Sequence, residues 1–239
     1  MPTVLITGAN RGLGLEFARQ YAAEGWRVIA TARSPDGAVA LHELAAATGE
    51  RVQVYGLDVA DFAAIEALAA TLSGVPIDVL INNAGSMGAA RTSAAGAAAQ
   101  RFGKSNYADW IDTFCINALA PMKMAEAFVE HIAASDEKKV VTLSSTLGSI
   151  GNNTLGGFYA YRSTKAAVNA VMKSLALDLA RRGIIAVPVH PGWVRTDMGG
   201  ASATLVPADS IAGLRRLIAR LTAVDSGRFW NWDGTEMPW

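Results

Sequence analysis

The alternation of short apolar runs with longer segments of helical spacing constrains the fold of this 239-residue chain most strongly. Between the runs, apolar residues recur every third or fourth position, as at Leu13, Phe17 and Tyr21. The candidate strands are Thr3–Thr7, Arg27–Thr31, Arg51–Tyr55, Val79–Ile81, Lys139–Ser144, Ile184–Val189 and, more weakly, Arg228–Trp230. Such alternation favours parallel strands covered by helices. We therefore expect an α/β fold with a doubly wound, mostly parallel sheet of about seven strands.

Composition excludes several classes of protein. Apolar residues make up 51% of the chain and charged residues 18%, so the chain can bury a core and global disorder is excluded. Lys and Arg together number 21, as do Asp and Glu, so a nucleic-acid partner bound by phosphate neutralisation is not expected. A single cysteine, Cys115, excludes an internal disulfide and a cysteine metal cluster, and we expect no metal site.

The chain shows no repeat and no Pro/Ser-rich linker, which predicts one domain over residues 1–239. Residues 86–106 are rich in Ala, Gly and Ser and are predicted as a surface loop with some helix. Met1-Pro2 leads directly into the first apolar run, without the pattern of a secretory signal. Charged residues interrupt every apolar stretch before it could span a membrane. We expect a cytoplasmic protein without a membrane segment.

Glycines at positions 8, 12 and 14 lie between the first predicted strand and the first predicted helix. Gly8 would permit a tight exit from the strand, Gly12 a close approach of backbone to a pyrophosphate, and Gly14 close packing of helix on strand. A simple tight turn is the alternative for such a triplet. The placement predicts a cofactor loop, whose other contacting residues are Asn10, Arg11 and Leu13.

Thr7-Gly8-x-x-x-Gly12-x-Gly14 resembles the signature of the short-chain dehydrogenase/reductase family, single-domain type. The stretches 148–162, 190–200 and 233–239 are similar to the branch that contains Sniffer-type carbonyl reductases and C-factor-like proteins. The resemblance covers essentially the whole chain. It implies a Rossmann fold, a nicotinamide cofactor and a small-molecule carbonyl substrate. It also implies a caution, because a signalling role is discussed for some C-factor relatives.

The end of the second predicted strand bears on the choice of cofactor. An enzyme that uses NAD normally places Asp or Glu here, whereas this chain has Ala32 followed by Arg33. Arg11, in the glycine loop, is expected on the same side. Two guanidiniums without a carboxylate suit a 2′-phosphate, the alternative being that both are solvated surface arginines. The sequence predicts NADP(H) in preference to NAD(H).

Further cofactor contacts are implied by the resemblance. They include Asp58 and Val59 at the adenine, although Asp58 could equally be a helix-capping or turn aspartate. The remaining contacts are Asn83, Ala84 and Gly85 after the fourth strand, and Pro191, Gly192, Val194 and Thr196 beside the nicotinamide. His190, at the end of the sixth strand, is interpreted as a hydrogen-bonded structural histidine and not as an acid or base.

Tyr161 and Lys165 are spaced to share one face of a helix. An ammonium beside a phenol is expected to lower the pKa of Tyr161 and to make it a general acid/base. In the resembling family this is the catalytic pair, and its lysine also binds the cofactor ribose. Both residues are therefore predicted as catalytic and as cofactor-binding.

The catalytic serine of the family maps to Ser145, with Ser144 as the alternative. The 16-residue spacing to Tyr161 exceeds the usual 12 to 13, and the glycine-rich residues 151–157 are expected to form the extra loop. Asn117 matches the helix asparagine that positions a water near the lysine. Its alternative is a buried amide that caps its own helix.

The predicted function is NADPH-dependent reduction of an aldehyde or ketone, with a small apolar or aromatic substrate. Two alternatives stay open: an NAD(P)-binding regulatory or signalling protein with little turnover, and an NAD-dependent alcohol dehydrogenase, against which Ala32 and Arg33 argue. The resemblance favours a homodimer or homotetramer. The small side chains Ala166, Ala167, Ala170 and Val171 could face a partner subunit or pack within their own.

Overall fold

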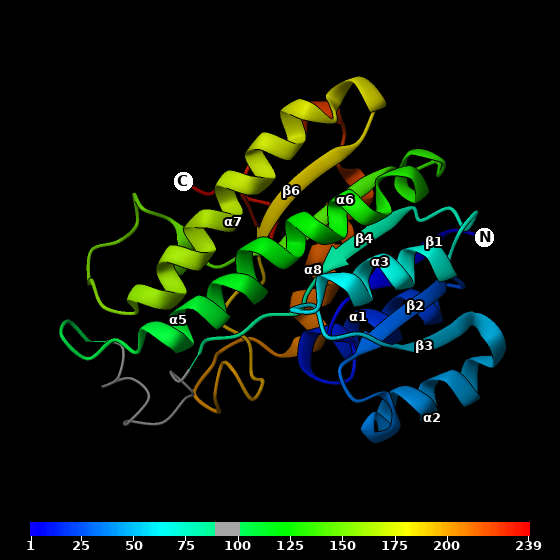
Figure 1. Cartoon of the computed structure of the whole chain (residues 1–239), viewed down its shortest axis with the longest axis horizontal. Coiled ribbons are helices and arrows are strands. Elements are labelled where there is room, and N and C mark those ends of the chain that lie inside the picture. The colour runs from blue at the N-terminus through cyan, green and yellow to red at the C-terminus, as the bar shows by residue number, and fades with distance from the viewer. Residues whose placement is uncertain (89–100) are drawn as a thin grey trace.

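A computed structural model describes residues 1–88 and 101–239. Its centre is a seven-stranded parallel sheet in the order β3-β2-β1-β4-β5-β6-β7 (Figure 1). The strands are β1 (Thr3–Ile6), β2 (Arg27–Ala32), β3 (Val52–Gly56), β4 (Val79–Asn82), β5 (Lys139–Leu143), β6 (Ile185–His190) and β7 (Trp230–Asn231). Strand order reverses between β1 and β4, which is the switch point at which doubly wound sheets bind ligands. The predicted fold class is confirmed.

Helices cover both faces of the sheet (Figure 1). The described helices are α1 (Gly12–Ala23), α2 (Val39–Thr48), α3 (Phe62–Thr71), α5 (Tyr107–Phe114), α6 (Ala120–Ala133), α7 (Tyr159–Asp178) and α8 (Pro207–Arg220). A single π-helical turn, Cys115–Leu119, joins α5 to α6 without a break. None of the helices in the described ranges is long and apolar enough to cross a membrane.

The core is divided by the sheet into two clusters because successive strand residues point to opposite faces. In β1, Val4 and Ile6 belong to the cluster under α1, α2 and α8, while Leu5 belongs to the cluster under α3, α6 and α7. All of β1 is buried. Apolar residues on both faces are what a doubly covered parallel strand requires, which is why the predicted strands were recognisable as unbroken apolar runs.

All seven predicted strands are present, with ends that differ by one or two residues. The largest error is at the C-terminal edge, where β7 begins at Trp230 and not at Arg228. The preceding Phe229 carbonyl accepts a hydrogen bond from Met237, and Trp230 forms an antiparallel bridge with Glu236. The position of this edge strand therefore depends on pairing with residues 236 and 237, which a local apolar pattern does not reveal.

The predicted surface segment 86–106 is partly described, and its residues 89–100 lie outside the described residues. On α7, Ala167 and Val171 pack against the core of their own chain, whereas Ala170 is exposed. The loops that follow β4, β5 and β6 gather at one end of the molecule, where α7 also begins (Figure 1). Because the strands are parallel, this end collects every strand's carboxyl terminus.

Candidate active site

The glycine loop leaves the first turn of α1 open to an anion. α1 begins at Gly12, the Arg11 side chain at its N-cap makes no capping hydrogen bond, and the first turn holds no acidic residue. The backbone N–H groups of that turn thus have no partner from within the helix. Such a helix start binds phosphate through these N–H groups and the helix dipole.

The loop after β4 fixes the glycine loop from behind. Asn83 Nδ2 donates to the carbonyl oxygens of Thr7 at 2.8 Å and Gly8 at 3.0 Å. A Cβ at Gly14 would clash with the Gly8 carbonyl and lie within 2.5 Å of Asn83 Nδ2. The close packing predicted for Gly14 is therefore present. Backbone held this closely, at the sheet's switch point, fits the cradle of a dinucleotide pyrophosphate.

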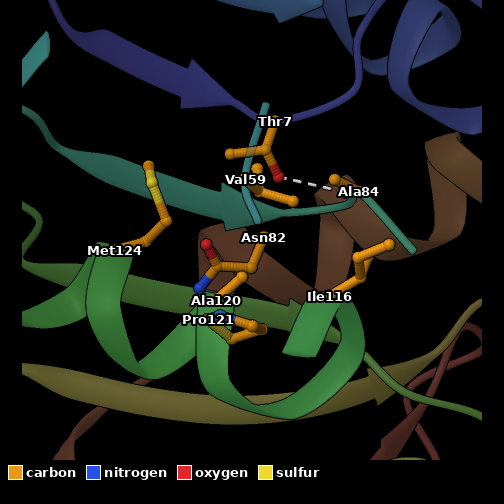
Figure 2. A pocket seen from close by; sticks show the side chains of 8 residues that line it. All are labelled: Thr7, Val59, Asn82, Ala84, Ile116, Ala120, Pro121 and Met124. Atoms are coloured by element: carbon orange, nitrogen blue, oxygen red, sulfur yellow. Dashed lines mark hydrogen bonds between the residues drawn. The ribbon is translucent and has the colours of Figure 1, made fainter. Parts of the chain in front are cut away.

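The pocket in Figure 2 belongs to this support and not to substrate binding. It is lined by Thr7, Val59, Asn82, Ala84, Ile116, Ala120, Pro121 and Met124. Its interior leaves no space for a water-sized molecule. The Thr7 hydroxyl accepts the Ala84 N–H at 3.0 Å, as Figure 2 shows, and it also accepts the Asn83 N–H at 3.0 Å. These bonds tie the loop after β4 to the end of β1.

The charged residues predicted for the cofactor are exposed. Arg33 follows the buried Ala32 and makes no hydrogen bond or ion pair with the described residues. Arg11 pairs with Asp197, with Nη1 2.9 Å from the carboxylate. Asp58 accepts the Ala60 N–H at 3.0 Å, so it has a turn-forming role, and its adenine contact stays a prediction.

Tyr161 and Lys165 lie on the first two turns of α7 and are both buried. Lys165 Nζ donates to the Leu143 carbonyl at 2.7 Å, at the end of β5. It also lies 5.8 Å from the centre of the Tyr161 ring. Gly85 packs beside Lys165 and Asn117. A Cβ at Gly85 would lie 3.7 Å from Lys165 Nζ and 3.3 Å from Asn117 Oδ1.

The expectation that Lys165 lowers the pKa of Tyr161 is wrong for this structure. Burial raises the pKa of Tyr161 to about 12, and the hydrogen bond with the Ser145 side chain only partly opposes it. Burial lowers the pKa of Lys165 to about 8. The ammonium is directed at the Leu143 carbonyl, and removal from water is the main cause of both pKa shifts. At neutral pH Tyr161 therefore holds its proton.

The two candidate serines have different surroundings. Ser144 is buried and donates to Asn169 Oδ1 at 2.6 Å, which holds β5 to α7. Ser145 Oγ accepts the Leu147 N–H at 3.1 Å, and the Ser145 side chain lies near enough to the Tyr161 phenol to oppose part of its pKa shift. The geometry thus directs Ser145, and not Ser144, toward the phenol. The residues between Ser149 and Phe158 form an exposed loop, as the long spacing predicted.

Asn117 lies in the π-helical turn with its side chain buried. Its Nδ2 donates to the Ser86 carbonyl at 2.7 Å and to Thr164 Oγ1 at 3.0 Å, and its Oδ1 accepts the Ser86 N–H at 2.8 Å. The alternative of an amide that caps its own helix is therefore wrong. Asn117 instead joins the loop after β4 to α7. Thr164 was missed, although its position three residues after Tyr161 places it on the same helix face.

The turn after β6 is built around Gly192, whose φ is +84°. A Cβ at Gly192 would lie 3.0 Å from the Trp232 ring, and Ser210 donates to the Pro191 carbonyl at 2.6 Å. These contacts hold the turn predicted to meet the nicotinamide. Thr196 Oγ1 accepts the Gly199 N–H at 3.1 Å, so it also has a local role.

His190 is not the hydrogen-bonded residue that the sequence suggested. Its Nδ1 is buried without a partner among the described residues. Burial lowers the pKa of His190 to about 4, with Asp233 opposing the shift. The ring is therefore neutral near pH 7.

Among the described residues, no three His, Cys, Asp or Glu side chains lie close enough together to hold a metal.

A glycine loop at the switch point of a parallel sheet is the mark of a nucleotide-binding α/β protein. More narrowly, the chain belongs to the short-chain dehydrogenases, since the family model described as short chain dehydrogenase matches residues 2–204. The chain is therefore an oxidoreductase of a family that binds a nicotinamide cofactor.

Individual proteins place it in the predicted branch. The chain is 42% identical to C-signal of Myxococcus xanthus over 175 residues, which are 73% of this chain and 100% of that protein. Carbonyl reductase Sniffer of D. melanogaster superposes with a TM-score of 0.89 at 34% identity, with full coverage of both chains. The NADPH-bound carbonyl reductase from chicken fatty liver gives a TM-score of 0.89 at 33% identity, over 100% of this chain and 99% of that one.

Proposed function

We propose that this protein reduces an aldehyde or ketone to an alcohol with NADPH, and that Tyr161 is the proton donor. The observation that carries the proposal is the buried Tyr161 phenol, with Lys165 Nζ 5.8 Å from its ring centre and the Ser145 side chain near enough to act on its pKa. Similarity to two carbonyl reductases, one of them bound to NADPH, supports it.

The residues fit a dinucleotide laid across the carboxyl ends of the strands. The N–H groups at the start of α1 would hold the pyrophosphate, Arg33 would meet the 2′-phosphate, and the turn at Pro191–Thr196 would contact the nicotinamide. When bound, the cofactor supplies the hydride. The protein's part is to orient the substrate and to deliver the proton.

Ser145 and Tyr161 donate hydrogen bonds to the carbonyl oxygen of the substrate. As hydride reaches the carbon, the C=O π bond breaks and the oxygen takes the Tyr161 proton, which leaves an alcohol and a phenolate. An alkoxide is a much stronger base than a phenolate, so a phenol of pKa about 12 still gives up its proton. Solvent then returns a proton to the phenolate, and the Lys165 Nζ stays 5.8 Å from the ring centre.

The raised pKa matches the protonation state that reduction needs. Oxidation of an alcohol needs Tyr161 as a phenolate base, and the phenolate is scarce when the pKa is about 12. Reduction starts from the phenol, which is the form present at neutral pH.

The test follows NADPH consumption with a panel of aldehydes, ketones, quinones and diketones. Tyr161→Phe should lower kcat about 10³-fold and leave NADPH binding within a few-fold of wild type, because only the proton donor is lost. Tyr159→Phe is the matched control, since the Tyr159 ring instead packs against Phe102 with 6.5 Å between centroids. Full activity in Tyr161→Phe would overturn the mechanism.

A signalling protein with little turnover is the second candidate, favoured by the 42% identity to C-signal. In that case the output would be an interaction controlled by the bound nucleotide. Tight NADPH binding without consumption of NADPH across the whole panel would favour this candidate. Consumption that depends on Tyr161 would favour the reductase.

A further inference from the structure

Residues 235–239, here called the tail, fold back along β7 and reach the loop before α7 (Figure 1). The Met237 N–H donates to the Phe229 carbonyl at 2.7 Å, and the Trp239 ring stacks on the Phe229 ring with 6.0 Å between their centroids. Phe229 is fully buried. A buried ring beside the edge strand therefore fixes the tail in place, because stacked aromatic rings remove a large apolar area from water.

The main-chain carbonyl of Trp239 joins the tail to the loop after β5. It accepts two hydrogen bonds, one from Ser149 Oγ at 3.1 Å and one from the Gly151 N–H at 2.8 Å. A Cβ at Gly151 would lie 3.3 Å from the same oxygen, so the two segments are in close contact. Ser149 is buried, whereas residues 150–156 are exposed. The tail thus holds this loop at its beginning, where the chain leaves the interior.

The residues that the tail holds directly follow the turn that presents Ser145. Ser145 Oγ accepts the Leu147 N–H, and the Ser145 carbonyl accepts the Gly148 N–H at 2.8 Å. The next N–H, that of Ser149, donates to the Thr146 carbonyl at 3.1 Å. Ser149 is therefore both the last residue of this turn and the first residue that the tail binds.

Helix α7 also holds this turn. A Cβ at Gly148 would lie 2.8 Å from Lys165 Cβ, and Asn169 Nδ2 donates to the Gly148 carbonyl at 3.3 Å. The turn is thus fixed both by the tail and by the helix that carries Tyr161 and Lys165. Hydrogen-bond donors stabilise a transition state best when they are fixed before the reaction. Loss of the contact with the tail should let Ser145 move relative to Tyr161.

We propose that the tail is a positioning segment for Ser145, and that Trp239 is its anchor. On this assignment, which rests on the proposed function, the tail acts through the turn at Thr146–Gly148 and not by contact with the substrate. Loss of the anchor should lower kcat, because a hydroxyl that moves away from the substrate oxygen stabilises the transition state less. The expected loss is about fivefold, which corresponds to one hydrogen bond of ordinary strength.

The first test measures kcat for NADPH-dependent reduction in Trp239→Ala, alone and combined with Ser145→Ala. Trp239→Ala keeps the main-chain carbonyl but loses the ring that stacks on Phe229. It should lower kcat about fivefold in the wild-type background and less than about twofold in the Ser145→Ala background, because the two residues act as one unit. Trp239→Phe, which retains a ring, should recover most of the loss.

Trp26→Ala is the matched control for Trp239→Ala. Trp26 packs against Tyr21 with 4.8 Å between ring centroids, so this variant also loses an aromatic pair. Trp26 precedes β2 and therefore lies at the amino end of the sheet, away from the site. Trp26→Ala should lower stability and leave kcat unchanged, which separates a loss of stability from a loss of position.

Hydrogen exchange measured by mass spectrometry gives a second readout, which does not depend on turnover. In the wild type the Gly151 N–H is bonded to the tail, so peptides that cover residues 149–158 should be partly protected. Trp239→Ala should speed exchange in these peptides at least about fivefold, because the bond to the tail is weakened. Trp26→Ala should leave exchange in these peptides unchanged.

An unchanged kcat in Trp239→Ala would overturn the inference, as would an equal loss of kcat in the wild-type and Ser145→Ala backgrounds. Unchanged exchange over residues 149–158 would also overturn it, because the tail would then not hold the loop. A wild type without turnover would instead contradict the proposed function, and the catalytic role of the tail with it. Faster exchange in Trp239→Ala would in that case still establish the contact between tail and loop.

Discussion

The cofactor end and the chemical end of the site differ in where their charges lie. At the cofactor end Arg11, Arg33 and Asp58 are exposed, whereas Tyr161 and Lys165 at the chemical end are buried. Exposed charges are screened by water and salt, so each shifts affinity by a small factor. Buried groups have displaced pKa values and no such screening. The two ends have one feature in common, which is a tightly packed backbone. At the cofactor end this packed backbone lies beneath the exposed charges.

The largest expected effect breaks that packing. Gly14→Ala places a methyl group against the Gly8 carbonyl and Asn83 Nδ2, and backbone cannot move as a flexible side chain would. We expect a loss of about 3 kcal/mol in the free energy of unfolding, measured by urea denaturation, and loss of NADPH binding.

Gly37→Ala is the matched control for Gly14→Ala. A Cβ at Gly37 meets no atom within 4 Å, and its φ lies outside the positive range. It should change stability by less than about 0.5 kcal/mol. Equal stability of the two variants would contradict the assignment of close packing to Gly14.

The next largest effect concerns the chemical end, where the buried Lys165 should make the free energy of unfolding depend on pH. The pKa of Lys165 is about 8 in the folded chain, below its ordinary value of 10.5, so the unfolded chain binds more protons between these values. The free energy of unfolding should therefore rise with pH from 8 to 10. We expect the wild type to gain roughly 2 kcal/mol over Lys165→Met in this window.

Urea denaturation at half-unit pH steps measures this difference. Lys173→Met, in the exposed lysine on the same helix, controls for the methionine substitution. Above pH 10 the raised pKa of Tyr161 acts in the opposite direction, because the unfolded chain then loses its tyrosine proton first. A constant difference between wild type and Lys165→Met from pH 8 to 10 would refute the burial of a charged lysine.

The smallest effect separates two exposed aspartates at the cofactor end. Asp58 accepts the Ala60 N–H, and Asp61 accepts the Ala64 N–H at 3.1 Å as the N-cap of α3. Either change to Ala should cost about 1 kcal/mol in stability. If Asp58 contacts adenine as predicted, only Asp58→Ala should also weaken NADPH binding, by about threefold. Unchanged binding in both variants would assign Asp58 to the turn alone.

The fold could be predicted because its evidence is local. Buried parallel strands appear as apolar runs, and a glycine-lined turn between strand and helix is visible at residues 8–14. The choice of Ser145 followed from the family resemblance, although its spacing to Tyr161 is longer than usual. The pKa of Tyr161 could not be predicted, because it depends on how much water the folded chain removes from the phenol.

Contacts across long sequence distances were also out of reach. Arg11 meets Asp197 and Asn117 meets Ser86 only after the loops converge at the end of the sheet. His190 was misjudged for a related reason, since hydrogen-bond partners on other segments are invisible in a local pattern. Short motifs thus predicted the elements and the residue types, while tertiary packing determined protonation and pairing.

The π-helical turn at Cys115–Leu119 has a consequence for the length of this chain. A π-helical turn contains one residue more than an ordinary α-helical turn. It therefore resembles a single-residue insertion within a continuous helix. Deleting one residue there would return the turn to α-helical geometry and change the direction in which Asn117 points. Asn117 would then lose Ser86 or Thr164 as partners. The extra residue of this turn therefore serves both the contacts of Asn117 in the site and the packing of Ala118 in the core.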